Sequence, residues 1–164
     1  DLNISGVGFT TGITRLSDSS IAYCDNGNDD IRKYSFDGTD WSQDGNALSI
    51  SIGSPQLAAL DGDTIAIAGS GVLSLRTYSF DGTDWSQDGN SLNISGILTP
   101  CIAALTSTTV AFIDDGNDDL RVYSWDGTDG SQVGNCSLYT SDAADDPVSV
   151  DRCGRRMNKK NVAD

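Results

Sequence analysis

The chain of 164 residues repeats one pattern three times. Tyr34 to Asn46 and Tyr78 to Asn90 both read YSFDGTDWSQDGN, and Tyr123 to Asn135 reads YSWDGTDGSQVGN. The copies begin 44 and 45 residues apart. A unit of this length holds one small motif, which must bury its apolar surface against its neighbours. The repeat over residues 1–135 therefore predicts a stack of similar units.

Each unit predicts four short strands and no helix. The strands are of the types IAAL, TVAFID, LRVYSWD and TDWSQDGN. The Asp-Gly pairs at 37–38, 81–82 and 126–127 predict a hairpin turn between the third and fourth strands. The chain has no Glu, three Lys and one Met, so that these three strong helix formers are nearly missing.

Both faces of the second strand are apolar. Val110 and Phe112 share one face and Ala111 and Ile113 the other, because side chains alternate along a strand. A strand with one face in water would alternate apolar with polar residues, so we expect each sheet to be covered on both sides. The first strand is short and, in two of the units, Ala-rich, which favours a central position, and the polar fourth strand favours the outer edge. These features predict β-propeller blades.

The predicted fold is therefore all-β. It is an incomplete β-propeller of three four-stranded antiparallel blades of 44–45 residues, at about 1–47, 48–91 and 92–135. A propeller normally closes with about 4–8 blades. The sequence therefore predicts a fragment of a longer repeat protein, and its ring would be closed by the remaining blades of the parent chain or by self-association.

The pattern L-R-x-Y-x-[FW]-D-G-T-x-W, which follows a polar Asp/Gly/Asn loop, resembles β-propeller repeats of bacterial secreted and surface proteins and of phages. It is most similar to integrin-like FG-GAP repeats and WD40-like blades. The units lack the Trp-Asp and Gly-His marks of WD40 repeats and the D-x-D-x-D-G calcium loop of integrin-type repeats. The resemblance implies an extracellular, cell-surface or virion protein.

Residues 136–164 do not continue the repeat. The strings LYTSDAADD and VDRCGRRMNKK resemble the conceptual translation of a transposon-type sequencing adaptor. We interpret this segment as read-through and expect it to be disordered; the alternative is a natural, disordered basic C-terminus. It contains five Lys and Arg and five Asp, so that the repeats carry the whole net charge of −14.

Charge and composition exclude several classes of function. A net charge of −14 repels a nucleic-acid backbone and an anionic membrane surface, and no apolar run predicts membrane insertion. The chain has no His, which excludes His-based triads and His zinc ligands. No catalytic constellation is visible, so we expect a chain that is not an enzyme.

Two acidic loops are candidate calcium sites. Asp25 and Asp29 lie in the loop of the first unit, and Asp114 and Asp118 in that of the third. Calcium binds six to eight oxygens, which such loops could supply. The middle unit has Gly69-Ser70-Gly71-Val72 at this place. We therefore favour turns that use Asn and Gly for a positive φ, and expect no other cofactor.

Two sets of repeated side chains are candidate ligand contacts. Arg32, Arg76 and Arg121 either stack on aromatic rings and pair with Asp, which we favour, or line a pocket for an anionic or sugar ligand. Trp41 and Trp85 on the fourth strand either clamp the neighbouring blade, which we favour, or stack on a sugar ring. Gly130 takes their place in the third unit.

These observations support a non-catalytic scaffold or protein-interaction module. The alternative is a multivalent carbohydrate-binding propeller with a sugar site at each blade. A third interpretation is one part of a propeller enzyme whose active site uses other blades. The expected partner is accordingly a protein or a glycan.

Overall fold

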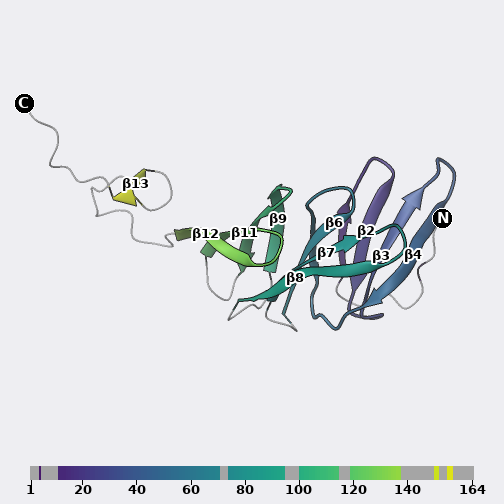
Figure 1. Ribbon diagram of the computed structural model, residues 1–164, viewed down its shortest axis with the longest axis horizontal. Coiled ribbons are helices and arrows are strands. Elements are labelled where there is room, and N and C mark those ends of the chain that lie inside the picture. The colour runs from purple at the N-terminus through teal and green to yellow at the C-terminus, as the bar shows by residue number, and fades with distance from the viewer. Residues whose placement is uncertain are drawn as a thin grey trace, which may run out of the picture.

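The computed structural model describes residues 4, 11–70, 74–94, 100–114, 119–137, 150–151 and 155–156. This part of the chain is all-β, with three four-stranded antiparallel sheets and one two-stranded pair. The three large sheets follow one another along the molecule (Figure 1). They confirm the predicted fold class of three blades in an open β-propeller. The described residues contain no helix that could span a membrane.

Each blade is built from four consecutive strands. Blade 1 contains β1 (Thr11–Arg15), β2 (Ser20–Asp25), β3 (Asp30–Phe36) and β4 (Trp41–Ser49). Blade 2 contains β5 (Gln56–Ala59), β6 (Thr64–Gly69), β7 (Ser74–Phe80) and β8 (Trp85–Asn93). Blade 3 contains β9 (Pro100–Thr106), β10 (Thr109–Asp114), β11 (Asp119–Trp125) and β12 (Gly130–Ser137). The pair β13 (Val150–Asp151) and β14 (Arg155–Arg156) lies outside the blades.

Strand order within each blade follows the sequence. The first strands β1, β5 and β9 are neighbours, and the last strands β4, β8 and β12 approach one another at the opposite edge. The first strands, of which β5 and β9 contain alanine pairs, thus gather at the inner edge, and the polar fourth strands lie at the outer edge.

The core consists of two blade junctions, in which a face with small residues meets a face with large ones. Blade 1 contributes Ala22, Cys24 and Ile31 to the first junction, and blade 2 presents Ile65, Ile67, Tyr78, Phe80 and Trp85. At the second junction blade 2 contributes Ala66, Ala68 and Leu75, and blade 3 presents Val110, Phe112, Tyr123 and Trp125. This explains why both faces of the second strands are apolar.

A repeated contact, which we call the junction clasp, joins the outer edges of neighbouring blades. Gly45 adopts a φ of 60° where β4 shifts register against β3. The next residue, Asn46, then turns its polar groups to blade 2. Its backbone N–H donates to the carbonyl of Thr83 at 2.7 Å, and its Nδ2 donates to Oδ1 of Asp84 at 2.9 Å.

The second junction repeats the clasp with the same geometry. The backbone N–H of Asn90 donates to the carbonyl of Thr128 at 2.7 Å, and its Nδ2 donates to Asp129 at 2.9 Å. Gly89 has a φ of 62°. The motif QDGN of one blade is therefore the partner of the motif DGTD of the next.

The residues that accept the hydrogen bonds of each clasp lie in a turn, and an aspartate side chain stabilises that turn. Oδ1 of Asp81 accepts the backbone N–H groups of Thr83 and Asp84, both at 2.8 Å. The N–H of Asp84, followed by that of Thr83, holds the pKa of Asp81 below its usual 3.8. The stabilisation from this turn is thus complete above pH 3.8 and is lost as the pH falls through the lower, folded-state pKa. Asp37 and Asp126 hold equivalent turns.

We predict that Gly45→Ala destabilises the protein strongly. A Cβ at Gly45 would lie 2.2 Å from the carbonyl oxygen of Thr83, and a left-handed φ costs a residue with a Cβ about 1–2 kcal/mol. We expect the free energy of unfolding to fall by about 2 kcal/mol or more in urea denaturation. Gly62→Ala is the control, because nothing lies within 4 Å of its Cβ; it should change stability by less than about 0.5 kcal/mol. Equal effects of both substitutions would contradict the clasp.

Candidate functional site

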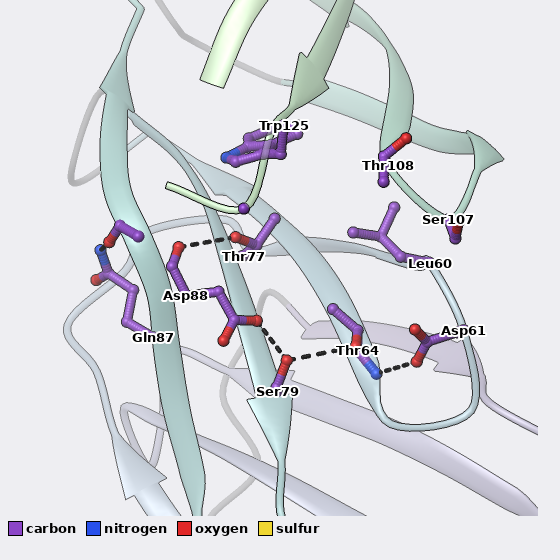
Figure 2. Close-up of a pocket in the computed structure, with 12 residues that line it drawn as sticks. Leu60, Asp61, Thr64, Thr77, Ser79, Gln87, Asp88, Ser107, Thr108 and Trp125 are labelled. Carbon is purple, nitrogen blue, oxygen red and sulfur yellow. Dashed lines mark hydrogen bonds between the residues drawn. The ribbon is translucent and has the colours of Figure 1, made fainter. Parts of the chain in front are cut away.

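A pocket of about 440 Å³ lies at the second junction, between blades 2 and 3. Blade 2 supplies polar side chains from β6, β7 and β8, and blade 3 supplies the residues that face them. Figure 2 shows the indole of Trp125 across the pocket from Thr77, with Thr108 beside Leu60. The lining residues are Leu60, Asp61, Thr64, Thr77, Ser79, Gln87, Asp88, Gly89, Ser107, Thr108, Trp125 and Gly127.

Hydrogen bonds hold the polar wall of the pocket in place. Ser79 donates its hydroxyl to Oδ2 of Asp88, and Thr64 and Ser79 share a hydrogen bond of 3.3 Å. Thr77 donates its hydroxyl to the carbonyl of Asp88 at 3.0 Å. Asp61 accepts the backbone N–H of Thr64 at 2.7 Å. The wall is therefore preorganised and rich in oxygen acceptors.

The first junction has a lysine where the second has this pocket. Lys33 pairs with Ala22 and Asp44 in blade 1 as Thr77 pairs with Ala66 and Asp88 in blade 2. The Nζ of Lys33 donates to Asp63 at 2.6 Å and lies 4.8 Å from the centre of the Phe80 ring. In the repeat, Thr108 is the counterpart of Asp63 and Trp125 that of Phe80. Thr77 is too short to fill the equivalent space.

In blade 3 the large and small residues of one strand pair differ from those of the other blades. Trp125 replaces a phenylalanine of the third strand, and Gly130 replaces a tryptophan of the fourth. Blades 1 and 2 pack Phe36 on Trp41 and Phe80 on Trp85, with ring centres 5.3 and 5.2 Å apart. In blade 3 the larger ring is on β11, and a Cβ at Gly130 would lie 3.1 Å from Nε1 of Trp125. The indole thus extends over Gly130, and its Nε1 is buried without a hydrogen-bond partner among the described residues.

The tryptophans expected from the sequence lie in different surroundings. Trp85 is 4% exposed and packs in the core of the first junction, whereas Trp125, which is 8% exposed, lines the pocket with part of its ring. Trp41 is half-buried on blade 1, where no described blade covers it. Neither residue lines the pocket of the second junction. The repeat predicts Trp125 only as an aromatic ring on the strand face of Arg121, and it predicts no ligand contact for Thr77 or Asp88.

The three arginines occupy equivalent places. Each arginine lies opposite the same position of the second strand in its blade. Arg32 is opposite Tyr23, Arg76 is opposite Ile67, and Arg121 is opposite Phe112. Arg32 donates to Asp30 at 2.7 and 2.9 Å, and the Tyr34 hydroxyl together with Asp30 raises the pKa of Arg32. Arg76 donates to the hydroxyl of Ser74 at 3.1 Å, because Ser74 takes the place of Asp30. None of the three lines the pocket.

The two acidic loops show only part of the predicted calcium sites. Asp29 has a φ of 52° and its carbonyl accepts the N–H of Ile50 at 2.7 Å, which makes it a turn residue. Asp118 and the side chains of Asp25 and Asp114 lie outside the described residues. Within the described part, no three His, Cys, Asp or Glu side chains group as a metal site.

Comparison with known proteins supports the fold and no narrower family. No protein-family model matches the chain, and no curated protein does. Among solved structures, a chain of the nidogen–laminin complex is 20% identical with a TM-score of 0.54, covering 77% of this chain and 48% of that one.

Two structures of the fucoside-bound lectin of Aleuria aurantia, both of the N224Q variant, also match. The complex with α-methyl-L-fucoside is 18% identical with a TM-score of 0.46, and covers 79% of this chain and 45% of the lectin. The complex with Fucα1-6GlcNAc is 17% identical with a TM-score of 0.47, and covers 89% and 49%. The chain thus spans about half the length of the chains that it matches.

Proposed function

We propose that this chain is a non-catalytic β-propeller binding module that holds a protein ligand, as part of a secreted, cell-surface or virion protein. The observation that carries the proposal is the pocket of the second junction. It combines an aromatic wall, a carboxylate and fixed hydroxyl groups in a concave site of about 440 Å³. Blades 2 and 3 hold the ring, the carboxylate and most of the hydroxyl groups on strands, which makes these blades a rigid scaffold for the site.

A carbohydrate ligand is the second candidate. Trp125 supplies a ring for a sugar to stack on, and Asp88, Thr64 and Ser79 supply hydrogen-bonding oxygens. This places the lectin hypothesis at the second junction and on Trp125. At the first junction Lys33 occupies the corresponding place. We therefore propose one sugar site, at the second junction, and not one site at each blade.

Thr77→Lys separates binding at this pocket from binding elsewhere. The substitution copies the residue that the first junction already accommodates, so we expect it to fold and to fill the pocket. We expect random-peptide display against the full chain to enrich peptides whose affinity falls at least tenfold in Thr77→Lys. The measurement is the dissociation constant of each enriched peptide for both proteins.

A glycan array, probed with the unmodified chain and with Thr77→Lys, tests the carbohydrate candidate. Glycan binding that is lost in Thr77→Lys would support the lectin candidate over the protein one. Ligands that bind both proteins equally would contradict the pocket as the site.

We also propose that a further blade of the same repeat covers the outer face of blade 1, which is the face directed away from blade 2. Ile13 is 64% exposed there, whereas its counterpart Leu57 is 8% exposed at the first junction. At the other end Leu105 is 57% exposed, whereas its counterpart Leu60 is 9% exposed. The covering blade comes from the parent chain or from a second copy, and two copies of three blades would form two identical head-to-tail junctions. The matched part of this chain covers only 48% of the chain from the nidogen–laminin complex, which supports the presence of further blades.

Analytical ultracentrifugation of the full chain tests the two-copy arrangement. We expect a species of twice the 17.2 kDa chain mass at micromolar concentration. Ile13→Asp should shift it to the monomer, because the charge would be buried at the new junction. Ser51→Asp, at an exposed linker residue, should leave it unchanged. A monomer at all concentrations would contradict association of two copies.

A further inference from the structure

We propose that the pocket of the second junction binds a primary alkylammonium group, such as the end of a lysine side chain. This inference rests on the proposed use of the pocket as a binding site and names the chemistry of its ligand. The repeat itself provides the template. The place that Lys33 occupies at the first junction is, at the second, an open pocket of about 440 Å³.

The first junction shows how blades of this kind hold an ammonium group. The side chain of Lys33 is largely buried, its Nζ donates to Asp63 at 2.6 Å, and the same atom lies 4.8 Å from the centre of the Phe80 ring. A carboxylate and an aromatic face together stabilise a cation that has lost part of its water. At the second junction Thr108 replaces Asp63, and the pocket offers Trp125 as the ring and Asp88, from the facing blade, as the carboxylate.

Charge in the pocket favours a cation over a neutral ligand. Asp61 and Asp88 both line it, and no described basic side chain forms an ion pair with either of them. Oδ2 of Asp88 accepts the hydroxyl of Ser79, and Oδ1 is left to accept from a ligand. At the first junction Lys33, the only lysine of residues 1–135, forms its ion pair with Asp63 and is the strand neighbour of Asp44, the counterpart of Asp88. The strongly acidic repeats further raise the local concentration of cations.

Trp125 suits this role better than the phenylalanine it replaces. Indole is the aromatic side chain that binds cations best. Its Nε1 lies against Gly130, and the ring lies across from Thr77 (Figure 2). The hydroxyl groups of Thr64 and Thr108, which also line the pocket, can accept the remaining N–H groups of an ammonium ion.

The test is an NMR titration of the full chain labelled with nitrogen-15, in which the three tryptophans give three indole N–H signals. Trp125→Phe identifies the signal of Trp125. The probe is Nα-acetyl-lysine methylamide, and its Nε-acetylated form is the matched control without charge. We expect the probe to shift the Trp125 signal with a dissociation constant on the order of 1 mM, and the control to bind at least about tenfold more weakly.

Two variants of pocket residues test whether the lysine probe binds at the second junction. We expect Thr77→Lys to abolish the shift, and Asp88→Asn, which keeps an oxygen for Ser79, to weaken binding about tenfold. Thermal unfolding of each variant shows whether it is folded. Spermidine distinguishes a free polyamine from a protein lysine: binding tighter than the lysine probe points to the polyamine as the source.

Equal shifts by the charged and acetylated probes, or no shift of the Trp125 signal, would overturn the ammonium proposal. If peptides or glycans nevertheless bind in a manner that Thr77→Lys abolishes, the pocket remains a binding site and only its ligand chemistry is wrong. If Thr77→Lys affects no ligand of any kind, the proposed function fails as well.

Discussion

The junction clasp is the constraint on which the arrangement of the blades depends. A blade has two apolar faces and cannot bury either of them alone, so its stability depends on its neighbours. Hydrophobic contact has no preferred direction, and sheets could slide past one another without a polar contact at a fixed place. The paired hydrogen bonds from Asn46 to Thr83 and Asp84 supply that place, and Asn90 repeats them. They explain why QDGN and DGTD occur together in one repeat: each is the partner of the other across a junction.

Fixed junctions allow small substitutions to create a site. The clasp has the same geometry at both junctions. A change of one side chain therefore alters the volume left between two blades and leaves the separation of their backbones unchanged. Lys33 fills that space at the first junction, and Thr77 leaves it open at the second. Trp125 extends over Gly130 and so forms a wall without displacing blade 3. A stack of near-identical units thus acquires a pocket at one junction through differences at a few positions.

The strands, the Asp-Gly turns and the two-sided burial follow from the sequence, since local alternation and turn residues determine them. The clasp does not, because it depends on a register shift that turns Asn46 outward from β4 and on the position of the neighbouring sheet. The pocket was missed for a related reason: it consists of residues from two blades that are about 40 positions apart. The polar fourth strand around Trp85 suggests a sugar platform, but Trp85 packs in the first junction, whereas Trp125, expected only as a ring beside Arg121, lines the pocket. Comparison of Lys33 with Thr77 at equivalent repeat positions was the available signal.

Amide hydrogen exchange at Asn46 and Asn90 tests the central claim most directly. Both residues lie in outer strands whose side chains are largely exposed, and both backbone N–H groups donate across a junction at 2.7 Å. If the clasp holds the blades together, these two amides exchange as slowly as those of the central strands β2 and β6. Exchange at the rate of freely solvated amides, with β2 and β6 still protected, would show that the blades fold without the clasp and would contradict the account.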